Sequence, residues 1–292
     1  MTSAACALLQ LLSTDRPRAK SLIVTVYGDS ILPFGGGCWL GALIDLVEPL
    51  GLNERVTRTA VFRLVQDGIL EAERVGRRSR YTLTRVGRRQ FDSAQARIYA
   101  SEPPRRDGRW TLVALPDALS AGERESLARE LGWLGFARLA PGLLGTARGD
   151  ASDQVITVLS ELNSAGDCAV FSAESKSDDT LPGLAAKAWP LEEIAADYAE
   201  FLDLFEPLRE DAAGLSPEDA FVARTLLIHA YRRALLRDPA LPDLLLPQGW
   251  PGHDARTLAR DLYRALQPAA QSHLKRVLSE EAANGVSIQR FK

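Results

Sequence analysis

The sequence predicts an α+β fold made of three consecutive domains, over residues 19–102, 107–178 and 184–286. In the first, apolar residues at helical spacing are followed by a hairpin pattern, and in the second, strand and helix patterns alternate. The third shows helical patterns only. Two loop-like stretches that contain proline, residues 101–108 and 172–183, mark the expected boundaries between the domains.

The composition of the 292 residues is that of a globular protein, with 46% hydrophobic residues. No stretch approaches the roughly 20 apolar residues that a membrane span requires. The mildly apolar start, residues 1–12, lacks the leading positive charges and the cleavage site of a signal peptide, so we expect an amphipathic helix there. The sequence therefore predicts a cytoplasmic protein without a membrane partner.

Cysteine and histidine residues are few and show no spacing typical of a metal site or a disulfide framework. They are Cys6, Cys38, Cys168, His229, His253 and His273. We therefore expect no metal and no cofactor, and we interpret the cysteines as small buried hydrophobic residues.

Charge is distributed unevenly along the chain. The net charge of −3 by itself argues against nucleic-acid binding. Residues 1–100, however, contain 14 Lys/Arg and 9 Asp/Glu, and residues 53–90 contain 10 Arg and 4 acidic residues. A basic segment in an otherwise acidic protein localises the attraction for phosphate to the N-terminal domain.

The first domain is predicted to contain helices followed by a hairpin. Residues 19–27 are apolar and fit a helix or a strand equally well. Residues 39–50 have helical spacing, and Asn53 is a typical N-cap for a second helix from residue 54 to about residue 67, which Gly68 would end.

A hairpin pattern occupies residues 69–83, with its turn at Gly76-Arg77-Arg78, and Thr84 would cap a further helix to about Ala100. Helices followed by a hairpin form the order of a winged helix-turn-helix. In that motif the second helix enters the major groove of DNA. The sequence therefore predicts a protein that binds double-stranded DNA.

Side chains on the second helix and on the hairpin, the wing, are candidates for DNA contact. On a helical wheel of the second helix, one side is formed by Thr57, Ala60, Val61 and Leu64. The candidates are Arg55, Arg58, Thr59, Phe62, Arg63, Arg77, Arg78, Ser79 and Arg80. Arginine suits guanine edges and phosphates, and threonine suits base edges. Phe62 fits a thymine methyl group, or packing against the wing or a partner subunit. The alternative for the wing is a solvated basic hairpin.

The second domain has the predicted order strand, helix, strand, helix, strand, consistent with a small ferredoxin-like unit. The segments are residues 110–115, 121–133, 136–145, 153–165 and 168–171. In the third domain we predict four helices, the second of them capped by Ser216, over residues 191–213, 217–237, 254–266 and 269–284.

Several strings spread along the chain are specific when taken together. They include Tyr27-Gly28-Asp29-Ser30, Arg58-Thr59-Ala60-Val61-Phe62-Arg63-Leu64, Gly76-Arg77-Arg78-Ser79, Leu226-Leu227-Ile228-His229-Ala230-Tyr231-Arg232-Arg233 and Trp250-Pro251-Gly252-His253-Asp254. In these strings the sequence resembles the PaaX-type repressors of phenylacetic-acid degradation operons, over about residues 21–278. The resemblance implies a homodimeric repressor of three domains: winged helix, a Cas2-like ferredoxin-like unit and a helical domain. It also implies release from the operator by an aryl-acetyl-CoA, typically phenylacetyl-CoA.

An acyl-CoA effector presents phosphates and an apolar acyl end, which require basic and aromatic side chains. His229, Arg232 and Arg233 are spaced to share one helix face, and Trp250 and His253 lie in a turn rich in proline and glycine. We expect these five residues to contribute to the effector pocket. The alternative is a structural joint in which His229 is buried and the arginines pair with acids.

Other functions fit the sequence less well. A metal-dependent nuclease needs acidic residues at a strand end, and the strand predicted over residues 110–115 contains none. No Ser/His/Asp, P-loop or HExxH pattern is present, so we expect no enzyme and no catalytic residues. A winged helix used only for protein interaction would have an acidic or apolar recognition face. The arginine-rich face and wing expected here argue against this function. A regulator that activates transcription, or one that responds to a different acyl-CoA, stays open.

Overall fold

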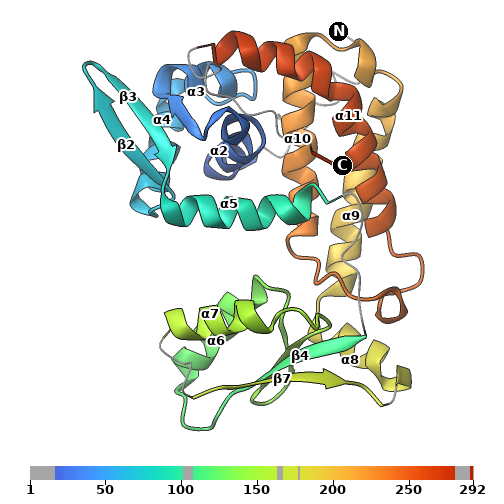
Figure 1. The fold of residues 1–292 in the computed structure, drawn as a ribbon. Coiled ribbons are helices and arrows are strands. Elements are labelled where there is room, and N and C mark those ends of the chain that lie inside the picture. The colour runs from blue at the N-terminus through green and yellow to red at the C-terminus, as the bar shows by residue number, and fades with distance from the viewer. Residues whose placement is uncertain (1–16, 101–107, 163–166, 177, 280–289, 292) are drawn as a thin grey trace. The chain divides into compact units, whose positions relative to one another are not determined.

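The computed structural model describes residues 17–100, 108–162, 167–176, 178–279 and 290–291 (Figure 1). The expected first helix, residues 1–12, and nearly all of the first boundary stretch lie outside these ranges. The chain forms two compact units: unit 1 comprises residues 1–101, 200–233 and 253–292, and unit 2 comprises residues 102–199 and 234–252. The division into three domains stays a prediction. Among the described residues, no helix is both long and apolar enough to cross a membrane.

The described part of unit 1 begins with a helix, where the sequence pattern fitted a helix or a strand equally well. Helix α2 (Ala19–Val26) continues directly into a π-helical turn, η1 (Tyr27–Ile31), and a 3-10 turn, η2 (Leu32–Phe34). Helices α3 (Leu40–Val47) and α4 (Glu54–Gln66) follow, and α4 packs against α2. The second helix predicted from the sequence is therefore confirmed as α4, and α2 is the helix against which it packs.

A three-stranded antiparallel sheet with the order β1-β3-β2 completes the N-terminal part of unit 1. The predicted hairpin is formed by β2 (Leu70–Val75) and β3 (Arg78–Leu83), and α5 (Arg85–Ile98) follows it. The first strand, β1 (Gly37–Trp39), was not predicted. Trp39 was expected to be helical, and this is wrong, because it pairs with Arg80 of β3. A strand of three residues is too short for a periodic pattern to reveal.

Three long helices come from the C-terminal part of the chain: α9 (Leu191–Phe205), α10 (Pro217–Leu235) and α11 (Gly252–Val277). The predicted helix over 191–213 ends early, at Phe205, and the chain continues as 3-10 turns η4 (Glu206–Arg209), which contains a proline, and η5 (Ala212–Gly214).

The two helices predicted over 254–266 and 269–284 are one helix as far as Val277, with Pro268 inside it. Buried apolar side chains on both sides of Pro268, among them Leu266 and Ala270, offset the lost backbone hydrogen bond. Residues 280–284 of the second predicted helix lie outside the described residues.

Unit 2 contains a four-stranded antiparallel sheet with the order β5-β6-β4-β7. Its elements are β4 (Arg109–Ala114), α6 (Ala121–Gly132), β5 (Ala137–Ala140), β6 (Leu143–Thr146), α7 (Ser152–Glu161) and β7 (Ala169–Glu174). The strand predicted over 136–145 is two strands, because the chain turns at Pro141 and Gly142, where the glycine has φ of 72°. The fold class is thus mixed α+β, as predicted.

The core of unit 2 lies between the sheet and helices α6 and α7. Val113 and Leu144 of the sheet pack with Leu127 and Leu131 of α6 and with Val155 of α7. The unit also contains turn η3 (Asp178–Thr180), helix α8 (Leu181–Ala188) and turn η6 (Asp243–Leu245). Trp189, directly after α8, packs on Trp110 of β4 with ring centroids 6.3 Å apart.

Candidate nucleic-acid interface

Helix α4 is fixed at both ends by its own sequence. The side chain of Asn53 accepts a hydrogen bond from the backbone nitrogen of Val56 at 3.0 Å, which caps the N-terminus. Gly68, with φ of 69°, lies just after the last turn and lets the chain turn into β2. The buried side of α4 consists of Thr57, Ala60, Val61 and Leu64, as the helical wheel predicted. The orientation of its outer face follows from this burial.

The outer face of α4 is basic and solvent-exposed. It carries all five of the candidates predicted on this helix: Arg55, Arg58, Thr59, Phe62 and Arg63. Arg58 donates to Glu54 one turn earlier, with Nη2 2.6 Å from Oε1. Within the described part of the chain, Arg55 and Arg63 have no carboxylate partner. This face therefore offers guanidinium groups that are available to phosphates or base edges.

Phe62 is 61% exposed, so most of its ring is not packed against the wing of its own chain. An apolar ring of this size on an otherwise charged face is unusual for a solvated helix. Of the three interpretations of Phe62, contact with a thymine methyl group and contact with a partner subunit stay open.

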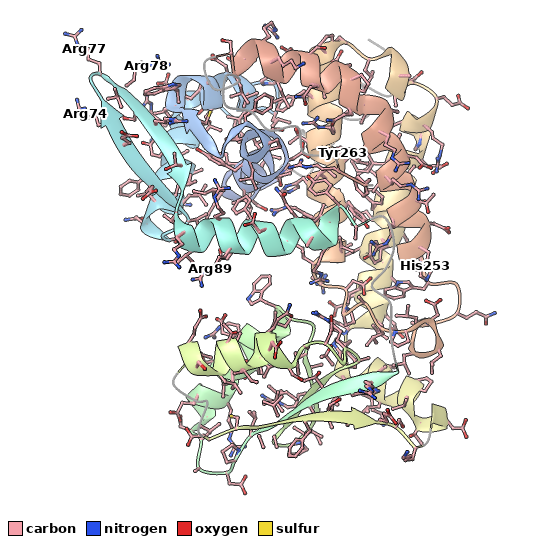
Figure 2. The ribbon with its side chains drawn as sticks, in the orientation of Figure 1. Arg74, Arg77, Arg78, Arg89, His253 and Tyr263 are labelled. Carbon is pink, nitrogen blue, oxygen red and sulfur yellow. The ribbon has the colours of Figure 1, made fainter. Side chains whose placement is uncertain are left out.

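The tip of the β2-β3 hairpin is a two-residue turn, since Val75 pairs with Arg78. Gly76 has φ of 62°, the conformation that a type II′ turn requires at its first central position. Figure 2 shows Arg77 at this tip and Arg74 along the adjoining edge. Arg74 was not among the predicted residues, and its Nε lies 3.4 Å from the carbonyl oxygen of Gly76.

The wing arginines differ in their exposure and in the contacts that their side chains make. The guanidinium of Arg78 stacks on the ring of Trp39, 4.2 Å from its centroid, and Arg80 is half-buried against Gly37. A Cβ at position 37 would lie 2.9 Å from the guanidinium of Arg80 and 2.9 Å from Cγ2 of Thr82, so a larger residue there would have to displace both side chains. Arg77 is exposed, while Ser79 is half-buried. Arg77 is therefore the wing residue best placed to reach a DNA backbone, and Arg78 and Arg80 also hold β1 on the sheet.

Helix α5 adds further exposed basic residues after the wing. Thr84 caps the helix by accepting a hydrogen bond from the backbone nitrogen of Gly87 at 2.9 Å, as predicted. Arg85, Arg88 and Arg89 are exposed in its first turns. The interface thus combines the outer face of α4, the hairpin tip and the start of α5.

Two of the five predicted effector residues meet helix α2. His229 Nδ1 lies 2.9 Å from Thr25 Oγ1, and Arg232 donates from Nη2 to the carbonyl and hydroxyl oxygens of Ser21, at 3.1 and 2.9 Å. Burial, together with the charges of Arg232 and Arg233, lowers the pKa of His229 to about 4, so it is neutral at physiological pH. These contacts join α10 to α2 within unit 1.

The other three predicted effector residues have different surroundings. Arg233 is exposed on α10, and His253 is exposed in the first turn of α11. Trp250 belongs to unit 2, where its ring packs edge-on against Tyr198 with centroids 5.9 Å apart. The five-residue pocket stays a prediction that the sequence alone supports.

A buried ionic cluster in unit 1 was not predicted. Asp29 of η1 accepts from Arg224 at 2.8 Å and Arg290 at 2.5 Å, and from the hydroxyls of Tyr99 at 2.7 Å and Tyr263 at 3.0 Å. Burial raises the pKa of Asp29, but the two arginines and the hydrogen bonds from Tyr99 and Tyr263 together lower it by more, so the net shift of the pKa is downward. The cluster joins η1, α5, α10 and α11. The string containing Asp29 was noted only as part of the resemblance.

Comparison with known proteins identifies the family of the chain. Family models described as PaaX-like protein and PaaX-like protein C-terminal domain match residues 18–87 and 189–276. The chain is 41% identical over 257 residues to the transcriptional repressor PaaX of Escherichia coli. The aligned region covers 86% of this chain and 81% of the relative. The solved structure of the uncharacterized protein Rv0674 from Mycobacterium tuberculosis has a TM-score of 0.49 and 22% identity, over 80% of this chain and 89% of that chain. On its identity to the Escherichia coli protein and the two family matches, the chain belongs to the PaaX family, which is not a family of enzymes.

Proposed function

We propose that this protein is a DNA-binding transcriptional repressor with an N-terminal winged helix. The observation that carries the proposal is the exposed basic face of α4, held outward by a buried opposite side and continued by the arginines of the hairpin. The 41% identity to a curated transcriptional repressor supports the same function. Within the described residues no cluster of three potential metal ligands is present.

In the proposed complex, α4 enters the major groove with Arg55, Arg58 and Thr59 toward base edges and phosphates. The hairpin places Arg77 and Arg74 along the flanking backbone, where their contribution is electrostatic. Two subunits of a homodimer bind two half-sites spaced about 10 base pairs apart, or a multiple of that spacing.

The remaining parts of the chain carry the proposed regulation. The strand order β5-β6-β4-β7, with two helices packed on the sheet, fits a ferredoxin-like middle domain. We assign the effector as an aryl-acetyl-CoA such as phenylacetyl-CoA, and the target as an operon of aromatic-acid catabolism in the cytoplasm. This rests on the family relationship. The effector releases the repressor because it binds the DNA-incompetent state more tightly.

Fluorescence anisotropy with the DNA upstream of the protein's own gene cluster tests this function. We expect specific binding whose logarithmic affinity falls with the logarithm of salt concentration, by roughly 0.9 for each phosphate contact. Phenylacetyl-CoA is expected to release the protein from the DNA. The effect of free phenylacetate on DNA binding is measured for comparison. Absence of specific binding would contradict the proposal. A reporter whose transcription rises when the protein is present would show an activator instead.

Phe62 gives a prediction specific to the α4 face. The change Phe62→Ala is expected to weaken operator binding by roughly 5- to 30-fold, because an apolar contact with a thymine methyl group is lost. The free energy of unfolding should change by less than about 0.5 kcal/mol, since the ring is exposed. Anisotropy and chemical denaturation measure the two quantities.

The matched control is Ile156→Ala, which removes an exposed apolar side chain from α7 in unit 2. It should leave operator affinity unchanged. Analytical ultracentrifugation of Phe62→Ala separates the remaining interpretation: a loss of dimer in the absence of DNA would place Phe62 at the partner subunit and contradict the base contact.

A further inference from the structure

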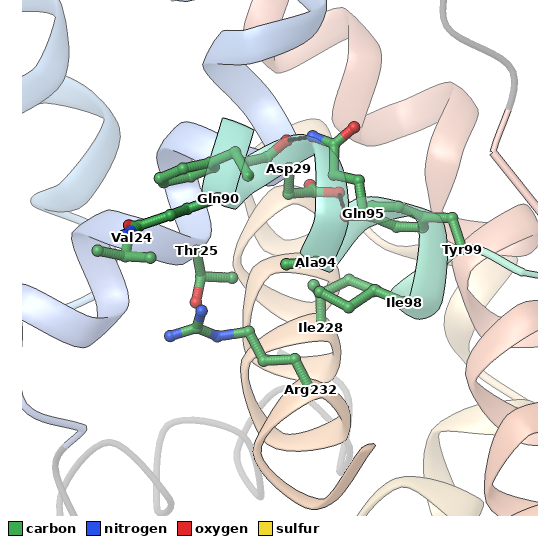
Figure 3. Close-up of a pocket in the computed structure, with 12 residues that line it drawn as sticks. Val24, Thr25, Asp29, Gln90, Ala94, Gln95, Ile98, Tyr99, Ile228 and Arg232 are labelled. Atoms are coloured by element: carbon green, nitrogen blue, oxygen red, sulfur yellow. Dashed lines mark hydrogen bonds between the residues drawn. The ribbon is translucent and has the colours of Figure 1, made fainter. Parts of the chain in front are cut away.

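Unit 1 contains a pocket between α2 with η1, helix α5 and helix α10 (Figure 3). Its walls are largely apolar, formed by Val24, Phe91, Ala94, Ile98 and Ile228. The cavity volume is about 170 Å³. A dry apolar cavity of roughly 150 Å³ is known to hold one benzene molecule, so this pocket is sized for a single aromatic ring.

Arg232 supplies the polar end of the pocket. Figure 3 shows its side chain extending from α10 toward Thr25 of α2. Its hydrogen bonds to Ser21 both start from Nη2, which leaves Nη1 and Nε for another acceptor among the five donors of the group. Within the described ranges, no carboxylate lies at ion-pair distance from Arg232. A mostly buried guanidinium without a counter-ion favours a ligand that brings an electron-rich oxygen.

The other charged groups around the pocket do not oppose such a ligand. Asp29 also lines it, but its carboxylate is already neutralised by Arg224 and Arg290. His229 hydrogen-bonds Thr25, and its low pKa keeps it neutral at physiological pH. Arg233 is exposed, so water screens its charge. The local field at the polar end is therefore positive.

We propose that this pocket binds the acyl group of an aromatic acid, with the ring among the apolar side chains and the acyl oxygen on Arg232. The proposal deepens the function proposed above, because it assigns the effector's acyl end to a site inside the unit that carries α4. The pocket is too small for a coenzyme A moiety, which would extend outside it. Free acid and thioester share the recognised chemistry.

Coupling to DNA follows from the packing of the pocket's own wall. Helix α2 forms one side of the pocket and packs against α4 on its other side. For the ligand to release DNA, the pocket must bind the ring more tightly when α2 takes an arrangement other than the one that supports α4 on DNA. By linkage, operator DNA must then weaken ligand binding by the same factor as the ligand weakens DNA binding.

Isothermal titration calorimetry of the full chain with phenylacetate, phenylacetyl-CoA and coenzyme A tests the site. We expect Arg232→Met to weaken binding of the acyl ligand by roughly 10- to 100-fold, because a charge-assisted hydrogen bond is lost. Arg276→Met, on α11 of the same unit and 68% exposed, is the matched control and should stay within about twofold of wild type. Ala94→Phe adds a ring inside the cavity and should abolish binding.

Thermal melting of each variant, without ligand, checks folding. If Arg232→Met does not fold, Ala94→Phe decides, because it removes no polar contact. The proposal is overturned if neither acyl ligand binds wild type at millimolar concentration, or if Arg232→Met and Ala94→Phe both bind like wild type. It is also overturned if coenzyme A alone binds as tightly as the thioester.

The same samples distinguish this proposal from the repressor function. Operator binding without ligand is measured by anisotropy on wild type and on Ala94→Phe, which is expected to bind DNA and to be insensitive to the effector. If the wild-type protein does not bind the operator, the repressor function is contradicted. Calorimetry still measures whether the pocket binds the acyl ligand. Normal DNA release from Ala94→Phe by either ligand would contradict the pocket while the repressor function stands.

Discussion

Replacing Arg55 and Arg58 together with alanine is expected to weaken operator binding by about 100-fold or more, the largest effect of any change at the proposed interface. Each arginine that contacts a guanine edge typically contributes about 1–3 kcal/mol of discrimination. Both side chains are exposed on the outer face of α4, and neither supports the core. The exposed pair of Arg58 with Glu54 stabilises the helix by less than about 0.5 kcal/mol, so folding should be unaffected.

Arg129→Ala with Arg138→Ala is the matched control for charge. These arginines belong to unit 2, their side chains are 62% and 56% exposed, and each lies near one glutamate, as Arg58 does. Fluorescence anisotropy measures the affinity of each double variant for the operator and for scrambled DNA. Only the α4 variant should lose more affinity for the operator than for scrambled DNA. Operator affinity within threefold of wild type would contradict the assignment of α4 as the recognition helix.

The features that the sequence predicted correctly are those set by neighbouring residues. The N-caps Asn53 and Thr84 act within three residues, and the buried side of α4 follows from its own periodicity. The turn at Gly76 requires only a local positive φ. Such signals do not depend on the rest of the fold, so one sequence suffices to interpret them.

The features that were missed depend on residues distant in the chain. Strand β1 exists because Trp39 pairs with Arg80, and this pairing also fixes the stacking of Arg78 on Trp39. Nothing near Trp39 indicates this. The pocket in unit 1 was not predicted, because helix packing brings its apolar wall from α5 against α2 and α10. Of the five residues predicted for an effector site, Arg232 is the one that lines it, and that prediction stays untested.

Asp29 shows the same limit most clearly, because its partner Arg290 is 261 residues away. Changing Asp29 to asparagine is expected to lower the free energy of unfolding by about 3–5 kcal/mol, since two buried guanidinium groups lose their counter-ion. That is a large fraction of a typical stability of about 5–15 kcal/mol. Chemical denaturation at neutral pH measures the change.

The control for the loss of a carboxylate is Asp117→Asn. Asp117 is fully exposed and its Oδ1 lies 3.4 Å from Nη2 of Arg124, so its replacement should leave the free energy of unfolding nearly unchanged. If Asp29→Asn were as mild as this control, the buried cluster would contribute little to stability. The helices it joins would then have to be held together by apolar packing alone.

The pH dependence of the Asp29 variant tests the electrostatic origin of this effect. Because the pKa of Asp29 is lowered in the folded protein, its carboxylate contributes stability above the usual aspartate pKa of about 3.9. That contribution is lost as the pH falls through the folded-state pKa. The difference in the free energy of unfolding between wild type and Asp29→Asn should therefore be constant from about pH 5 to pH 8, and it should become smaller below about pH 4. A difference that persists unchanged into acid would mean that the amide disturbs packing, and that the charge pairs are not what stabilises the junction of η1, α5, α10 and α11.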